Sequence, residues 1–205
     1  MLEKLIFRTE VKEILLGYIQ KGNVRPGERI SLPKIAAELK VSGTPIREAL
    51  TQLSETGIVT YIANRGFFVT ELSQKEAKEI NDLMALLEGE AVNNSTYTPD
   101  QLVDLAEINA AFQQATDPRD KLNQDRLFHQ KLIETYPNAY AHKIIEDLRI
   151  RISVYEHQFM GADPGSESVN MHKNIIRYLT ADNKDAAVQE LRLNWRLGIE
   201  HIVRQ

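Results

Sequence analysis

Apolar residues in the first part of the chain recur at the spacing of an amphipathic helix. The segment LEKLIFRTEVKEILLGYIQ places five of them on one face when it is wound at 3.6 residues per turn. These five are Leu5, Val11, Leu15, Leu16 and Ile19. The following segment KGNVRPGER ends the pattern, because Gly22-Asn23 terminates helices and Pro26-Gly27 favours a turn. The pattern predicts a helix over residues 2–20, followed by a turn.

Two shorter helical segments and a pair of strands follow. Ser31 is a candidate cap for a helix through LPKIAAELK, and the dipeptide VS is a tight link to the next helix. Thr44-Pro45 starts that helix as cap and first-turn proline, with Ser42 as a competing cap. The runs IVTYI and GFFVT, separated by ANR, are rich in β-branched and aromatic residues and predict a β-hairpin. This order of elements is that of a winged helix-turn-helix.

From Ser73 onward the pattern is helical only. Capping boxes at Ser73–Glu76 and Thr98–Gln101 open two helices, the first reaching about Asn93. Four more helices are predicted from the flanking turn signals: from Asp117 to near Pro137, from Ala139 to about Met160, then, after the loop GADPGSES, to Thr180, and finally to the C-terminus. We therefore predict a mainly α protein with a winged helix-turn-helix domain over residues 1–72 and a six-helix antiparallel bundle over 73–205.

Composition excludes several classes of site and adds a charge asymmetry. The 205 residues contain no cysteine, which excludes disulfides, zinc–thiolate sites and thiol nucleophiles. The segment MLEKLIFRTEV is charged within four residues, so we expect no signal peptide or membrane association and a cytoplasmic location. Residues 1–76 hold 11 Lys and Arg against 9 Asp and Glu, whereas residues 77–205 hold 14 against 20. A net of +2 beside −6 is compatible with nucleic-acid binding by the first segment, and equally with chance.

The start of the second short helix carries groups suited to DNA. Ser42 and Thr44 are short enough to contact phosphate oxygens, and backbone N–H groups at a helix start favour the same anions. Arg47, one turn later, can donate two hydrogen bonds to a guanine edge. Arg65 lies at the predicted hairpin tip, where a wing contacts DNA. Taken singly, each has an ordinary alternative: helix capping for Ser42 and Thr44, a surface ion pair for Arg47, and a solvated turn for Arg65.

The combination resembles a known family. VRPGERISLPKIAAELKVSGTPIREALTQLSETGIVTYIANRGFFV, residues 24–69, is similar to the DNA-binding domain of the GntR family of bacterial transcription regulators. The resemblance implies that DNA contacts come from Ser42, Thr44, Arg47, Arg65 and Gly66. The family usually has an arginine that reads a base directly after the serine, and this chain has Gly43 at that position. The absence of that contact removes about 1–3 kcal/mol of discrimination between bases. A different operator sequence is therefore expected.

The bundle resembles the ligand-binding FCD domain of the FadR-like branch of that family, in three segments: LMALLEGEAV, DRLFHQKLIETYPNAYAHKIIEDL and NMHKNIIRYLTADNKDAAVQEL. From spacing alone, Asp125 and His129 share one helix face, an arrangement more often found in a surface salt bridge. The resemblance implies a divalent metal, zinc, nickel or manganese, at four positions: Asp125, His129, His172 and Asn194. Asn194 replaces a histidine, which weakens the expected affinity.

Two further positions bear on a ligand of the bundle. Met84 stands where many relatives have an arginine that anchors a small carboxylate. Arg149 and Arg151 are candidate substitutes as effector-binding residues, or else lie on a solvated helix face. Trp195 is interpreted as a core or dimer contact.

The leading hypothesis is a homodimeric transcription regulator, most often a repressor in this family. It binds double-stranded operator DNA and is switched by a small metabolite, for which an organic acid is one candidate. A metal-dependent hydrolase using the Asp125, His129 and His172 cluster is the rival from another class, although the sequence lacks HExxH and an evident general base. A third reading keeps the DNA-binding domain and makes the bundle a dimerisation module without effector.

Overall fold

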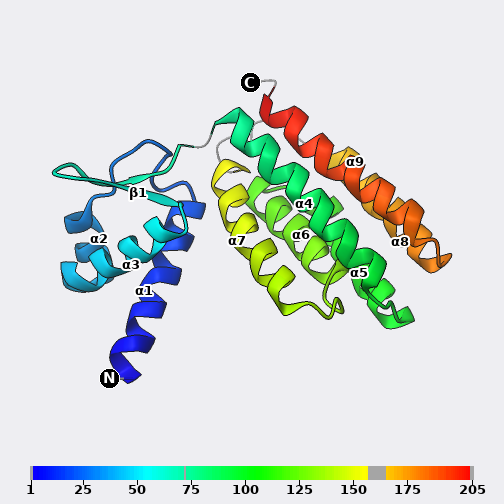
Figure 1. Ribbon diagram of the computed structural model, residues 1–205, viewed down its shortest axis with the longest axis horizontal. Helices are drawn as coiled ribbons and strands as arrows, with labels where there is room; N and C mark the ends of the chain where they lie inside the picture. The colour runs from blue at the N-terminus through cyan, green and yellow to red at the C-terminus, as the bar shows by residue number, and fades with distance from the viewer. Residues whose placement is uncertain (1, 72, 157–164, 204–205) are drawn as a thin grey trace. The chain divides into compact units, whose positions relative to one another are not determined.

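The computed structural model describes residues 2–71, 73–156 and 165–203, and the chain divides into two compact units. The first consists of Met1–Ser73 with Arg149–Gln158, and the second of Gln74–Leu148 with Phe159–Gln205. Figure 1 labels their helices and the first strand. The predicted mainly α fold, with a small winged sheet, is confirmed.

The first unit has the predicted helix-turn-helix and hairpin. Its elements are α1 (Leu2–Gln20), α2 (Leu32–Leu39), α3 (Gly43–Glu55), β1 (Val59–Ile62) and β2 (Gly66–Val69). The two strands pair antiparallel, with Val59 opposite Val69 and Ile62 opposite Gly66. Arg29 adds a bridge to Phe68, so the segment before α2 extends the hairpin on its second strand.

One apolar core holds the first unit together. Of the predicted α1 face, Val11, Leu15, Leu16 and Ile19 are buried, while the side chain of Leu5 lies outside the described residues. They pack with apolar residues of α3 and the hairpin, including Ile46, Leu50, Leu53, Val59, Phe67 and Val69. Val154, from the C-terminal part of α7 (Ala139–Glu156), belongs to the same core.

The turn between α2 and α3 corrects one detail of the prediction. Ser31 caps α2 as expected, accepting a hydrogen bond from Lys34 N. Lys40 then adopts a left-handed conformation, φ 54°, and ends α2. Helix α3 begins at Gly43, so Ser42 rather than Thr44 occupies its N-cap position. Pro45 lies within the first turn, where a missing N–H costs no intrahelical bond.

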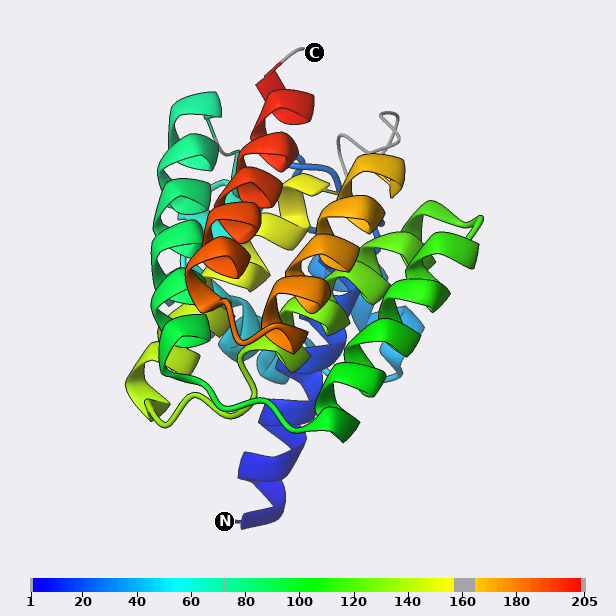
Figure 2. The same ribbon diagram turned by 90° about the vertical axis from the view of Figure 1, so that its right-hand side faces the viewer.

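The second unit is an antiparallel helical bundle. Among the described residues, it contains α4 (Gln74–Asn94), α5 (Pro99–Gln114), α6 (Pro118–Leu132), the first part of α7, α8 (Gly165–Thr180) and α9 (Lys184–Val203). Figure 2 shows α4, α9, α8 and α5 side by side, and α6 packs against α5. None of the helices in the described part of the chain has the length and apolar character needed to span a bilayer.

Caps and turns fix the helix limits in the bundle. Thr98 and Gln101 form the predicted capping box, with both reciprocal hydrogen bonds, and Asp117 caps α6 through Arg119 N. Helix α8 begins at Gly165, so GSES, predicted as loop, is its first turn. The predicted end of the preceding helix at Met160 lies outside the described residues.

Candidate functional site

The start of α3 presents its polar side chains outward. Ser42 has extended backbone angles, φ −71° and ψ 162°, and its hydroxyl makes no cap hydrogen bond with the helix. Ser42, Thr44 and Arg47 are all exposed. On the other face of the helix, Ile46 is completely buried in the core. The leading edge of α3 is therefore accessible to a ligand while the apolar face holds the helix in place.

The hairpin tip brings a cation to the surface of the same unit. Asn64 (φ 61°) and Gly66 (φ 97°) are both left-handed, which closes the three-residue turn. Arg65, exposed between them, lies with its guanidinium carbon 5.2 Å from the centre of the Phe68 ring. This stacking orients the arginine along β2 and keeps its donors available.

Gly43 is not required by the backbone at its position. Apart from its chain neighbours and the backbone of its own helix, a Cβ built on it meets no atom within 4 Å, and its φ is not in the left-handed region. Glycine in a helix costs about 1 kcal/mol relative to alanine. The fold therefore leaves open space beside Gly43, on the exposed edge of α3.

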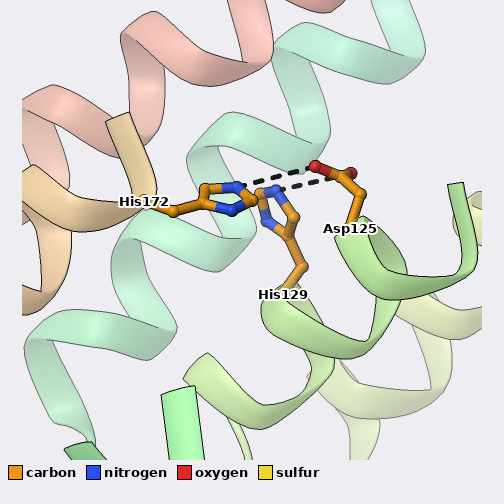
Figure 3. Close-up of side chains that lie close together, drawn as sticks. All are labelled: Asp125, His129 and His172. Atoms are coloured by element: carbon orange, nitrogen blue, oxygen red, sulfur yellow. Dashed lines mark ion pairs between the residues drawn. The ribbon is translucent and has the colours of Figure 1, made fainter. Parts of the chain in front are cut away.

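In the second unit, the structure brings together Asp125, His129 and His172 (Figure 3). Asp125 and His129 lie one turn apart on α6, and His172 faces them from α8. One carboxylate oxygen of Asp125 is 3.9 Å from His129 Nε2, and the other is 3.6 Å from His172 Nε2. One ligand atom from each of the three side chains lies within 4.8 Å of the others.

Asn194, the fourth predicted position, also belongs to this cluster. Its Oδ1 is 3.1 Å from His129 Nε2, and the residue is buried on α9. The other ring nitrogen of His129, Nδ1, is 2.7 Å from Glu88 Oε2. A carboxylate oxygen only accepts, so Nδ1 carries the proton that it donates to Glu88. In the neutral imidazole, Nε2 then carries no proton, and its lone pair points into the cluster, where a cation could accept it.

His172 is oriented in a similar way. Its Nδ1 is 3.1 Å from Asn109 Oδ1, while Asn109 Nδ2 donates to the carbonyl of Val169. The amide therefore offers its oxygen, and His172 Nδ1 donates to it. The Phe128 ring stacks on the imidazole, with 3.7 Å between the ring centres. Burial, reinforced by the nearby His129, lowers the pKa of His172 well below 6.5, so its ring is neutral.

These groups fit a divalent cation. His172 Nε2 is buried without a hydrogen-bond partner among the described residues. It faces Asp125, and the same cluster holds His129 Nε2 and Asn194 Oδ1, so electron-pair donors from four side chains converge. Carboxylate, two imidazoles and an amide oxygen suit zinc, nickel or manganese. The four side chains are therefore chemically suited to a divalent metal ion, although Asn194 is neutral.

Glu88 and Asn109 are site residues that the sequence interpretation missed. A signal for them was present. Glu88 stands in the buried stripe of α4 with Met84, Ala91 and Val92, and Asn109 stands in that of α5 with Leu105 and Phe112. A carboxylate or amide in an apolar stripe requires a buried partner. The sequence does not reveal that the partner is an imidazole more than 40 positions away.

Arg149 and Arg151, the candidate effector residues, belong to the first unit. Arg149 is buried, and the Arg151 guanidinium packs against Gly57, which follows α3. The structure therefore gathers Asp125, His129, His172 and Asn194 in one unit and places these two arginines in the other.

Comparisons with known proteins match both units. The gntR family of bacterial regulatory proteins matches residues 7–69, and the FCD domain matches residues 79–195. The HTH-type transcriptional regulator YdhC of Bacillus subtilis is 25% identical over 97% of this chain and 90% of its own. The Nta operon transcriptional regulator of Aminobacter aminovorans is 33% identical over 62% of this chain and 63% of its own.

Solved structures agree with the fold. Escherichia coli McbR/YncC has a TM-score of 0.84 at 25% identity, covering 97% of this chain and 98% of its own. A GntR regulator from Rhodococcus sp. RHA1 has the same TM-score at 24% identity, covering 96% and 97%. The family and these relatives are regulators and not enzymes, so the comparisons give the hydrolase alternative no support. The chain belongs to the GntR family of bacterial regulatory proteins, and it is a ligand-responsive, DNA-binding transcription regulator with an FCD domain.

Proposed function

We propose that this regulator is a cytoplasmic repressor that binds operator DNA as a homodimer. The winged domain, residues 1–72, reads DNA, and residues 73–205 carry the effector site and the dimer contacts. Two relatives carry the name repressor: the gluconate operon repressor of Bacillus licheniformis and the probable D-xylose utilisation operon repressor of Paenarthrobacter nicotinovorans. A dimer presents two copies of α3 to successive major grooves, which suits an operator with two related half-sites.

In this proposal the exposed edge of α3 enters the major groove. Ser42 and Thr44 bind phosphate oxygens, and Arg47 donates to a guanine edge. Arg65 and Gly66 at the hairpin contact the adjacent backbone. The observation that carries the proposal is the exposure of Ser42, Thr44 and Arg47 on a helix whose opposite face is fully buried.

Operator binding by an arginine variant tests this role. Arg47→Ala should cost about 1–3 kcal/mol on the operator and less on random DNA, because it removes a base contact. Arg126→Ala removes an exposed arginine of α6 and is the matched control for the loss of charge. Electrophoretic mobility shifts on operator and random duplexes measure both. Equal losses on the two DNAs would refute base reading by Arg47.

We further propose that Asp125, His129, His172 and Asn194 hold one divalent metal in the bundle. When bound, the ion would supply a Lewis-acidic centre suited to the carboxylate of an organic-acid effector. The chain's own part is to fix the donor atoms: α6 places Asp125 and His129 one turn apart, and α8 and α9 bring His172 and Asn194 to them. Arg149 and Arg151 do not enter this proposal, because they lie in the first unit.

A switch requires that the effector bind two arrangements of the protein with unequal affinity. Metal analysis and mass spectrometry of the purified protein test whether the bundle carries an ion and a small acid. Operator binding is then measured with zinc, nickel or manganese, with and without a chelator. Sedimentation velocity tests the dimer. A dimer whose operator affinity responds to neither metal nor organic acids would support a bundle that only dimerises.

A further inference from the structure

Glu88 is a fully buried carboxylate with a defined set of donors. It lies on α4, and its relative exposure is 0%. His129 Nδ1 donates to its Oε2 at 2.7 Å, and Trp195 Nε1 donates to the same oxygen at 2.9 Å. Both N–H groups converge on one oxygen of the side chain, so the two hydrogen bonds hold it in a single orientation. The Glu88 carboxyl group therefore contacts the ring nitrogen of His129 that points away from the cluster.

The charges of the proposed ligands leave a deficit that Glu88 fills. Among Asp125, His129, His172 and Asn194, only Asp125 is an anion when both imidazoles are neutral. A divalent ion held by this set keeps one uncompensated positive charge in a buried site, which is costly. Glu88 is joined to the set through a single imidazole ring. It adds the second negative charge without occupying a coordination position.

We propose that Glu88 is a positioning residue of the metal site, which fixes His129 with its Nε2 toward the ion and supplies the compensating charge. Asn109 does the first of these for His172 and not the second, because its amide is neutral. The inference rests on the proposed metal site. It predicts that the site can bind a metal with the neutral Asn194 as a ligand, because the Glu88 carboxylate bonded to His129 compensates for the weak basicity of the Asn194 amide oxygen.

Two substitutions at position 88 separate charge from geometry. In Glu88→Gln, the amide oxygen can still accept from His129 and Trp195, while the negative charge is removed. In Glu88→Asp, the charge is kept and the reach to His129 is shortened. Loss of an outer partner of a ligating histidine typically weakens metal binding about 10- to 100-fold. Glu88→Gln should show a loss in this range for zinc, and Glu88→Asp should recover part of it.

The matched control is Glu90→Gln. Glu90 lies on the same helix, exposed, and bonds the Asn94 side chain, so its loss should leave zinc affinity within about twofold. Dissociation constants are measured for each full-length protein by titration against a competing chelator. Circular dichroism confirms that each variant is folded.

The possible results distinguish the role of Glu88 from the proposed metal site itself. Wild-type protein that binds none of zinc, nickel and manganese would overturn both. Wild-type binding with unchanged affinity in Glu88→Gln, or equal loss in the Gln and Asp variants, would overturn the charge role of Glu88 alone. A direct readout needs no variant: in the zinc form, nitrogen NMR of labelled histidine should show His129 metal-bound at Nε2 and protonated at Nδ1. Binding through Nδ1 would overturn the inference.

Discussion

At Asn194 an amide oxygen lies 3.1 Å from His129 Nε2, where the family pattern has a third imidazole. An amide oxygen is a neutral and weakly basic ligand, whereas an imidazole nitrogen binds zinc and nickel strongly. The residue is buried, so bulk solvent does not compensate for the difference. In the proposed metal site, this one side chain would therefore limit the affinity for the ion.

Asn194→His should tighten zinc binding by about tenfold or more, a gain of about 1.4 kcal/mol or more in binding free energy. The added imidazole supplies a stronger electron-pair donor at a position that already faces the cluster. Titration against a competing chelator measures the change. The control is Asn174→Gln, because Asn174 lies half-buried on α8 and its amide donates to Glu190 rather than to a residue of the cluster. No gain in Asn194→His would argue against Asn194 as a ligand position.

Gly43→Arg should add a base contact without disturbing the fold, since a Cβ at this position meets no neighbouring atom within 4 Å. The new guanidinium would lie on the exposed edge of α3, beside Thr44. Selection from a random duplex library should show one additional guanine preference per half-site, worth about 1–3 kcal/mol. Thermal unfolding of both proteins checks stability. An unchanged consensus would mean that position 43 does not face the bases.

At the scale of helices and strands, hydrophobic periodicity and caps predict most of the architecture. The capping box at Thr98 and the cap at Asp117 locate their helix starts correctly because these signals act locally. Helix α3 begins earlier than a cap at Thr44 predicts, because Ser42 and Thr44 are both good caps and the sequence does not decide between them. The roles of Glu88 and Asn109 depend on which helices become neighbours, and this is a tertiary property.

Thr98→Ala should lower the free energy of unfolding by about 1 kcal/mol, because the first turn of α5 loses the hydrogen bond from Gln101 N. Urea denaturation followed by circular dichroism measures the change. Thr180→Ala is the control: its exposed hydroxyl bonds the carbonyl of Ile176 within the same helix, and its loss should change stability by less than about 0.5 kcal/mol. Equal effects would show that the capping box adds no stability.

At the scale of the whole molecule, stability is linked to the protonation of one buried ring. The pKa of His172 is lowered well below 6.5 by burial and by His129. As the pH falls through about 6.5, His172 therefore becomes protonated in the unfolded chain but stays neutral in the folded chain. The stabilisation is fully present above that pH, and it is lost as the pH falls toward the folded pKa.

In metal-free protein, the free energy of unfolding should fall below pH 6.5 with a contribution of up to about 1.4 kcal/mol per pH unit from this group. His172→Gln should lack that contribution and show a shallower pH dependence. Urea denaturation at several pH values between about 5 and 8, with a chelator present, measures both proteins. Parallel curves for the two would show that His172 is protonated alike in the folded and unfolded chains.

The participation of Val154 in the first hydrophobic core bears on how the protein can be dissected. Val154 is 4% exposed and packs with residues of α1, α3 and the hairpin, although it follows them by more than eighty positions. A fragment that stops at residue 72 would lack this side chain and the hydrogen bond from Gln20 to Ser153. A fragment of residues 1–72 expressed by itself therefore leaves part of its apolar core uncovered. The C-terminal part of α7 has to be supplied to complete that core.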